Sequence, residues 1–286
     1  MTYIPKEITE EVNVTPTHPL VNLGYLVGTV VTVIVVIYAA MGVAVDLVVP
    51  RLSRATEVKI GNGLLPTVRE QFGGQELVND SRVDYLNELM QPLVGDDLQD
   101  LPITIHLMET DMANAAIIAG GHVFVTTGLL AESRSENELV FILGHELGHL
   151  AHRDSLKSLG RSLFLMLGNI VLGLGTQNGQ SSPLLTTTID LQSLHYSREQ
   201  EDQADRYGMT LAVEQYGHGG YALDFFERNS AAEPSFIPEY ALTHPLSKKR
   251  IEALETFATQ QSWALTGTLV PLPDGIECPN FACRDE

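Results

Sequence analysis

Basic residues are scarce in this sequence. Lysine and arginine together number 17, against 36 aspartates and glutamates, which gives a formal net charge of −19 at pH 7. A protein that binds nucleic acid neutralises phosphates with clustered lysines and arginines. No such cluster is present, so we expect no nucleic-acid partner, and the acidity is typical of a well-solvated surface.

Cysteine is scarce as well. The chain has two cysteines, Cys278 and Cys283, both within the last nine residues. Two thiols cannot provide the disulfide framework of a small secreted domain. Their short spacing would allow one local disulfide, which would persist in an oxidising compartment. The alternative is a pair of free thiols in an irregular tail.

Formal charge is absent from residues 19–45. About twenty apolar residues span a bilayer as a helix, and in lipid only a helix satisfies its own backbone hydrogen bonds. We therefore expect a transmembrane anchor over residues 19–45, preceded by a flexible arm over residues 1–18. The alternative is a cleaved signal peptide, which would have a shorter apolar stretch and a basic segment before it. The preceding segment is acidic, so we favour the retained anchor.

Residues 55–260 have the periodicities of a folded domain that is mostly helical with a small sheet. Apolar spacing and capping residues predict helices over residues 81–93, 135–152, 191–215 and 245–259, and strands over residues 56–60, 103–108, 115–119 and 122–127. The Gly61-Asn62-Gly63 sequence predicts a break after the first strand, and Gly120-Gly121 predicts a hairpin between the last two. The apolar residues 163–174 are too few to span a membrane and indicate a buried or membrane-dipping helix. Residues 261–286, with three prolines, predict an irregular C-terminal tail.

The strongest chemical signal is the sequence His145-Glu146-Leu147-Gly148-His149. Residues four apart lie on one helical face, so the two imidazoles can reach the same zinc ion. Glu146 would then lie beside the ion, where it can act as a general base without binding the metal. The neighbouring residues are apolar, and a buried cluster of this kind needs partners or a metal ion to offset its desolvation.

A catalytic zinc ion needs a third protein ligand, and the acidic segment 197–205 offers candidates. Glu201 and Asp205 are four residues apart and share a helical face. Glu201 could bind the metal, while Asp205 could accept the outer N–H of a ligand histidine. The alternative is a solvated acidic helix, which would be favoured if the histidine motif did not precede it.

These motifs together resemble a known family. The HELGH sequence at 145–149, the SREQEDQAD sequence at 197–205, and Thr243-His244-Pro245 with Arg250-Ile251 resemble motifs of the membrane zinc metallopeptidases that include the HtpX proteases and the CAAX prenyl endopeptidases, a group of gluzincins. The segment 114–130 also resembles the strand and turn before the family's active helix. The similarity covers about residues 55–260. With one apolar span, this chain is closest in layout to single-anchored or periplasmic members, which makes the processing of prenylated CAAX proteins doubtful.

The resemblance implies an α+β zincin-like metallopeptidase domain that holds one zinc ion per chain. It implies His145, His149 and Glu201 as ligands, with Asp205 behind them. It also implies that His244 lies near the metal, where it could donate to a developing oxyanion; the alternative is that this segment only begins a helix. The role of Arg250 is left open between the site and an ordinary ion pair.

The expected function is therefore zinc-dependent hydrolysis of peptide bonds by a membrane-anchored endopeptidase. Its substrates would be polypeptides, with unfolded or damaged proteins as the expected class, held by pairing with the strand at residues 122–127. A module that holds membrane proteins without cutting them is the alternative. The sequence carries no signal of oligomeric state.

The sequence features that bear on which side of the membrane the domain lies do not agree. Arg51, Arg54 and Lys59 follow the span and Lys6 precedes it, which favours a cytoplasmic domain. The cysteine pair, the acidic surface and the resemblance to single-anchored relatives favour the extracytoplasmic side. We expect an extracytoplasmic domain.

Overall fold

The computed structural model describes residues 18–171, 176–177, 180–181, 196–230, 240 and 243–276. It divides into two compact units, Met1–Ala44 and Val45–Glu286. The N-terminal arm before residue 18 and the cysteine pair lie outside the described residues, as do the side chains of residues 164–174. Within the described part, the chain is mostly helical with a small four-stranded sheet, as predicted, and a two-stranded sheet of β5 (Thr176–Gln177) and β6 (Gln180–Ser181).

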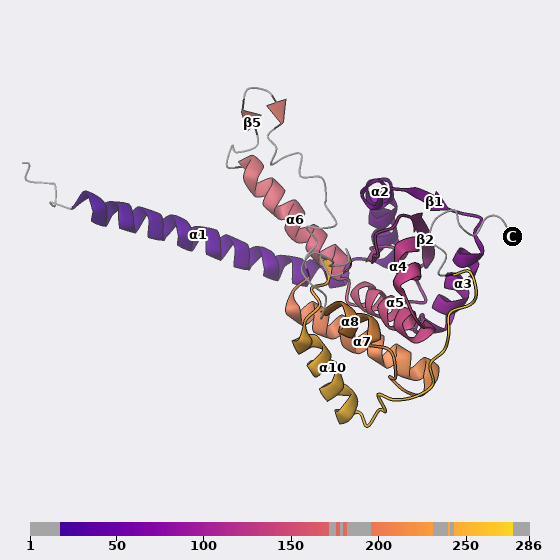
Figure 1. Ribbon diagram of the computed structural model, residues 1–286. Helices are drawn as coiled ribbons and strands as arrows, with labels where there is room; N and C mark the ends of the chain where they lie inside the picture. The colour runs from indigo at the N-terminus through magenta and orange to yellow at the C-terminus, as the bar shows by residue number, and fades with distance from the viewer. Residues whose placement is uncertain are drawn as a thin grey trace, which may run out of the picture. The chain divides into compact units, whose positions relative to one another are not determined.

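The charge-free run forms the long helix α1 (Pro19–Val48), which is indigo in Figure 1. Most of its valine, isoleucine and leucine side chains are exposed. Among the described residues, it is the one helix that is long and apolar enough to cross a membrane. A short 3-10 turn, η1 (Val49–Arg51), follows it.

The four-stranded sheet has the order β1-β2-β4-β3. Its strands are β1 (Gln75–Leu77), β2 (Thr104–Glu109), β3 (Ala115–Ile118) and β4 (His122–Thr126). β2 and β4 are parallel, while β1 with β2 and β3 with β4 are antiparallel. The hairpin between β3 and β4 turns at Gly120 and Gly121, whose φ angles of 85° and 87° suit glycine. The prediction that the strand at 122–127 pairs with substrate is wrong, because β4 already pairs on both sides; among the described strands, the edges of this sheet are β1 and β3.

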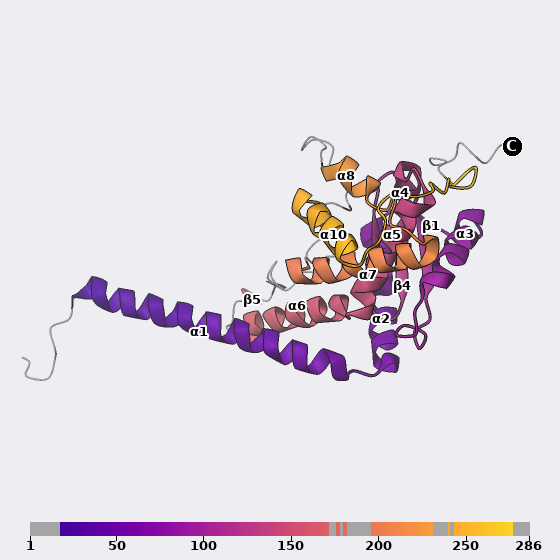
Figure 2. The same cartoon turned by 90° about the horizontal axis from the view of Figure 1, so that it is seen from below.

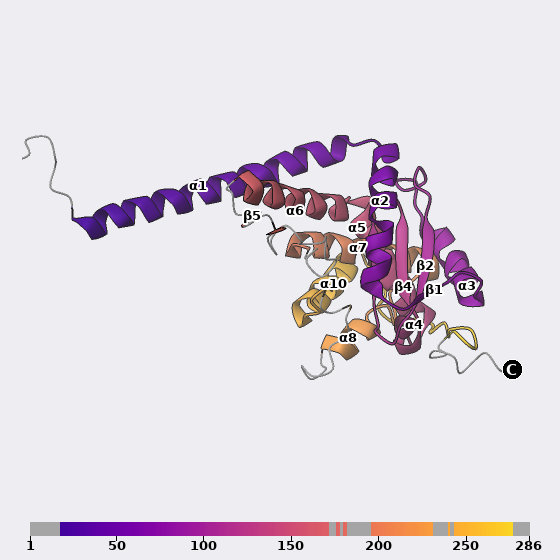
Figure 3. The same ribbon diagram turned by 90° about the horizontal axis from the view of Figure 1, so that it is seen from above.

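Helix α2 (Arg54–Phe72) covers one face of the sheet, and Figure 3 shows it beside the strands. Val68 and Phe72 of α2 pack on Phe124 of β4 and its neighbours. The predicted strand at 56–60 and the break after it are therefore wrong. Ser53 caps the helix by accepting from the backbone N–H of Thr56. A Cβ at position 61 would lie 1.8 Å from the carbonyl oxygen of Ala119, so glycine is needed for α2 to pack this closely against that residue.

The other face of the sheet packs on helix α5 (Glu136–Ala151) and helix α3 (Ser81–Met90), which share one core with β2, β3 and β4. Helix α4 (Thr127–Glu132) directly follows β4. The predicted helices at 81–93 and 135–152 are confirmed, the first ending in the 3-10 turn η2 (Gln91–Leu93). Every residue of α5 from Asn137 to Leu150 is buried.

The remaining helices are α6 (Asp154–Val171), α7 (Arg198–Tyr216), α8 (Asp224–Ser230) and α10 (Lys248–Gln260). Figure 2 shows α7 between α5 and α10, and it packs on both. α7 begins at residue 198 and not at 191, because Ser197 forms a capping box with Gln200. α10 likewise begins after its cap Ser247, two residues beyond Pro245. Residues 263–276 contain neither helix nor strand, in accord with the predicted irregular tail.

Candidate metal centre

Helix α5 presents His145 and His149 from one face, one turn apart. Both side chains are completely buried. Ser135 begins the helix by accepting from the backbone N–H of Glu138, which fixes where the turns of α5 fall. The two imidazole rings meet edge to face with centroids 4.7 Å apart, and their Nε2 atoms are 3.1 Å apart.

Small residues bring α7 unusually close to α5 at this point. A Cβ on Gly144 would lie 3.0 Å from the Cα of Gly208, and one on Gly148 would lie 2.8 Å from the Cα of Ala204. The two helices therefore cross backbone to backbone. Glu201, one turn before Ala204, reaches the histidines because of this close approach. The sequence signal was available in the glycine and alanine pairs spaced four apart on both helices, but sequence reasoning did not use it.

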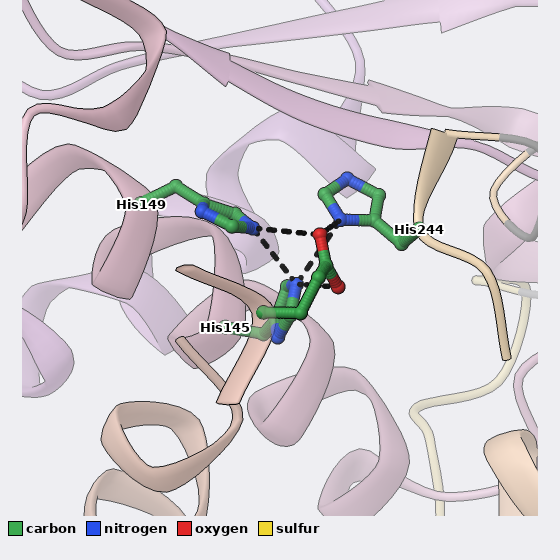
Figure 4. A group of neighbouring side chains, drawn as sticks. His145, His149 and His244 are labelled. Carbon is green, nitrogen blue, oxygen red and sulfur yellow. Dashed lines mark hydrogen bonds and ion pairs between the residues drawn. The ribbon is translucent and has the colours of Figure 1, made fainter. Parts of the chain in front are cut away.

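Four side chains converge at one point: His145, His149, Glu201 and His244. One ligand atom from each lies within 4.8 Å of the others. Figure 4 shows the three imidazoles pointing toward one another, with His244 coming from the segment before α10. Glu201 Oε2 lies 3.6 Å from His145 Nε2, and its Oε1 lies 3.6 Å from His149 Nε2. The structure thus brings together the three residues predicted to be ligands.

The protonation pattern of the two α5 histidines suits a bound cation. His149 Nδ1 lies 3.1 Å from Asp154 Oδ2, and His145 Nδ1 lies 2.9 Å from Asp205 Oδ1. Carboxylates at both Nδ1 atoms favour protons there, which leaves the Nε2 lone pairs facing each other. Such a pair needs a positive charge between its nitrogens, either a proton or a metal ion. Buried imidazole and carboxylate donors of this kind are the ligands that zinc prefers, so the residues fit the ion.

The pKa values of the two histidines shift in opposite directions. Burial lowers the pKa of His145 to about 3, although Asp205 opposes the change. Burial also disfavours a charge on His149, but the hydrogen bond to Asp154 and the carboxylate of Glu201 outweigh it and raise its pKa to about 9. The surroundings therefore favour one positive charge at the point where the donors meet.

Asp205 lies behind His145, as expected, and is tied to Arg250. Arg250 Nη2 and Nε donate to the two Asp205 oxygens at 2.7 and 2.8 Å, and its Nη1 lies 2.8 Å from Glu201 Oε2. Burial would raise the pKa of Asp205, but Arg250 and then His145 outweigh it and hold that pKa below its usual value. Arg250, whose role the sequence left open, thus bridges Glu201 and Asp205.

Asp154 is the site residue that sequence reasoning missed. It is the first residue of α6, five positions after His149, and its side chain is completely buried. Lys157 donates to its other oxygen at 3.2 Å. No helical spacing predicts this contact, because it depends on how the chain turns between α5 and α6.

Glu146 lies beside the cluster with no strong partner. Both of its carboxylate oxygens are buried and form no hydrogen bond of good geometry within the described part of the chain, although the backbone of Ile117 on β3 lies near enough to oppose the rise in its pKa. Its Oε1 lies 3.4 Å from His244 Nε2. Burial raises the pKa of Glu146 above the usual value for glutamate, and the nearby histidines only partly offset this. A buried carboxylate with free lone pairs is suited to accepting a proton from a water molecule.

His244 is held directly against the other donors. Its Nδ1 lies 3.0 Å from Glu201 Oε1 and 3.2 Å from His145 Nε2. Tyr240 stacks on its ring at 4.7 Å between centroids, and Tyr196 stacks on His149 at 3.9 Å. In this arrangement His244 supplies a fourth donor, whereas the sequence placed it only near the metal.

Comparisons with known proteins agree with this geometry. Residues 81–258 match the family model of peptidase family M48. The chain is 30% identical over 180 residues to the mitochondrial metalloendopeptidase OMA1 of Schizosaccharomyces pombe, which covers 60% of this chain and 51% of that protein. It is 27% identical over 223 residues to the beta-barrel assembly-enhancing protease of Escherichia coli, covering 73% of this chain and 45% of that protein. The bovine mitochondrial metalloendopeptidase OMA1 is 31% identical over 191 residues, or 62% of this chain and 36% of that protein.

These matches adjust the resemblance drawn from the sequence motifs. The chain spans about half the length of the first two relatives. The relatives carry the names of OMA1 and of the beta-barrel assembly-enhancing protease, so the likeness is to the M48 family and not specifically to its HtpX or CAAX prenyl endopeptidase branches.

Proposed function

This chain belongs to peptidase family M48, and from that premise we propose that it is a membrane-anchored zinc endopeptidase that cleaves unfolded or damaged proteins. M48 enzymes are metal-dependent, and the convergence of His145, His149 and Glu201 in a buried cluster is the observation that carries the proposal. The relatives named as a metalloendopeptidase and as a protease support the same chemistry.

The proposed metal is one zinc ion per chain, held by His145, His149 and Glu201. Two neutral imidazoles and one carboxylate are a frequent zinc set in peptidases that keep one position open. Asp154 and Asp205 would fix the orientation of the two rings through their Nδ1 atoms. Arg250 would hold Glu201 and Asp205 in place through its ion pairs.

The proposed mechanism assigns the proton transfers to Glu146. A bound zinc ion supplies Lewis-acid polarisation and makes a nucleophile available at neutral pH. Glu146 takes a proton from the attacking water and then gives it to the leaving amine, a task that suits its raised pKa. His244, 3.4 Å from Glu146, would donate to the developing oxyanion once substrate has displaced it from the ligand cluster.

The proposed substrate site is the edge strand β3 (Ala115–Ile118). Among the described residues, β3 pairs with β4 on one side and with no strand on the other. β3 packs on α5, the helix that carries Glu146. An extended polypeptide could add to this edge by backbone hydrogen bonds, which read chain shape more than sequence. Unfolded segments are the substrate class that such binding favours.

The proposed location is a membrane, with α1 as the single anchor. The exposed apolar side chains of α1 support this, because such a surface is costly in water. We place the catalytic domain on the extracytoplasmic side, on the sequence argument from the acidic surface and the cysteine pair. Protease treatment of intact spheroplasts is expected to degrade the domain; protection, with freely labelled thiols at Cys278 and Cys283, would place it in the cytoplasm.

The proposed activity is tested by casein cleavage with the wild type and with Glu146→Gln. The variant keeps every ligand, so we expect wild-type zinc content and loss of cleavage. A wild type that binds zinc yet cuts nothing would favour the alternative module that holds proteins without cutting them. Cleavage by Glu146→Gln at the wild-type rate would contradict the role of Glu146.

A further inference from the structure

Arg153 lies in the turn between α5 and α6, and its backbone has a conformation that is unfavourable for any residue with a side chain. Its φ is 57°, in the left-handed region. It follows His152, the C-cap of α5, at a position where helices commonly place glycine. A residue with a Cβ carries a steric cost in this conformation. The contacts of the arginine side chain must offset that cost.

Those contacts lead to the segment that follows α1. Arg153 Nη1 donates to the carbonyl oxygens of Val49 and Leu52, each at 2.8 Å. These carbonyls lie at the end of a helical segment, where a cation is favourable; the Val49 oxygen also accepts from the backbone N–H of Leu52 at 3.1 Å. Arg153 Nε also lies 3.4 Å from Oε2 of the completely buried Glu57 on α2. Only 14% of the Arg153 side chain is exposed. The guanidinium therefore connects the turn to residues 49–57 through contacts that are mostly buried.

The next residue in the chain holds a proposed metal ligand. Asp154 accepts from His149 Nδ1 at 3.1 Å, and neither side chain is exposed. Carboxylates in this position fix the tautomer and orientation of a ligand histidine. Because Arg153 and Asp154 are joined by one peptide bond, any movement of the turn also moves the carboxylate behind His149.

We propose that Arg153 is a positioning residue for the metal centre, which fixes the turn of residues 152–154 to the segment Val49–Leu52 and thereby holds Asp154 against His149. The inference rests on the proposed zinc site. It makes the segment that follows the apolar helix α1 part of the support of the metal site. A displacement of residues 49–52 would loosen His149 without touching any ligand.

The test measures how fast a chromophoric chelator removes zinc from the full-length protein in detergent. Arg153→Gly deletes the side chain and also relieves the left-handed backbone, so it separates the side-chain contacts from helix capping. We expect zinc release about three- to tenfold faster, below the 10–100-fold effect typical of residues that touch a ligand directly. Arg153→Lys, which lacks the planar fork, should lie between the wild type and Arg153→Gly.

Arg161→Ala is the matched control. Arg161 lies on the same helix α6, 34% of its side chain is exposed, and its ion pair is with Asp46 at 3.4 Å and not with the turn of residues 152–154. The Arg161→Ala variant also removes one positive charge near the end of α1, but it leaves the contacts of the turn in place. Its zinc release should therefore match that of the wild type. Thermal unfolding of each variant is followed in parallel, because a purely structural role would lower the melting temperature without changing zinc release.

A double variant decides whether Arg153 acts through Asp154. Asp154→Asn alone should speed zinc release, and Arg153→Gly added to it should have much less than its separate effect, since contacting residues that act in one network are not additive. Wild-type release from Arg153→Gly, or effects that multiply in the double variant, would overturn the inference while leaving the peptidase proposal intact. A wild type that holds no zinc would overturn both.

Discussion

At the residue scale, the site combines local spacing with long-range contacts. His145, Glu146 and His149 could be predicted because the spacing of four on one helix is a local property. Glu201 and Asp205 followed the same rule on a second helix, and the family resemblance connected the two. Asp154 and Arg153 could not be predicted, since their contacts depend on the turn after α5.

The assignment of Glu201 as the third ligand gives a direct prediction. Loss of a residue that only supports a metal ligand lowers metal affinity by up to about 100-fold. Glu201→Ala removes a ligand itself, so it should lower zinc affinity by more than about 100-fold. Glu199→Ala removes an exposed carboxylate two residues away in the same first turn of α7, and it should leave affinity unchanged. Isothermal titration with zinc compares them. If Glu199→Ala abolishes binding and Glu201→Ala does not, the register of the third ligand is wrong.

At the element scale, packing overrode local propensity. The β-branched residues near 56–60 suggested a strand, but this segment is a helix that Ser53 caps and that Gly61 allows to pack closely against Ala119. The hairpin of β3 and β4 was predictable because two glycines stand between alternating apolar residues. The order of the strands was not, since β2 and β4 pair across a long connection that no local pattern specifies.

The close crossing of α5 and α7 should tolerate no added methyl group. A Cβ on Gly208 would lie 2.8 Å from the backbone nitrogen of His145. Gly208→Ala should therefore push the helices apart, lower the free energy of unfolding by about 1–3 kcal/mol and weaken zinc binding. Gly63→Ala on α2, where a Cβ meets nothing within 4 Å, should be neutral or stabilising by up to about 1 kcal/mol. Urea unfolding measures the stability of both variants. Equal stability would contradict the close backbone contact between α5 and α7.

The sheet and α2 should respond to acid through His122. Its Nδ1 lies 3.0 Å from His106 Nε2, and its Nε2 lies 2.9 Å from Asn62 Oδ1 on α2. Burial, with the charges of His106 and Arg69, lowers the pKa of His122 below 6.5, while Glu76 opposes the change. The unfolded chain therefore binds a proton that the folded chain does not, so stability is complete above pH 6.5 and is lost as pH falls toward the folded pKa. Urea unfolding at pH 7.5 and 5.5 should show a smaller loss for His122→Gln than for the wild type, and an equal loss would exclude this role.

At the scale of the whole molecule, the chain divides at Ala44, close to the end of the predicted anchor. The catalytic unit has its own core and contains every residue of the proposed site. The segment Val49–Leu52, to which Arg153 is tied, also belongs to it. The apolar helix α1 was predictable from the absence of charge over residues 19–45, whereas the contacts between Arg153 and residues 49–52 depend on the three-dimensional fold.

Deletion of residues 2–45 should release the protein from the membrane fraction with its zinc site intact. It removes most of the one described helix that is both long and apolar enough to span a membrane, and it keeps the carbonyls that Arg153 binds. Carbonate extraction and zinc analysis of the truncated protein measure the outcome. Membrane association that resists carbonate would reveal a second integral segment, for which the apolar residues 163–174 are the candidate.

The central claim is that one metal ion at the His145, His149 and Glu201 cluster makes this chain a peptidase. The most direct measurement is a zinc titration of chelator-treated, full-length protein with casein cleavage as the readout. We predict that the treated protein is inactive and that activity returns linearly and saturates at one zinc per chain. Full cleavage by the metal-free protein, or saturation that is unchanged when Glu201 is replaced by alanine, would contradict the account.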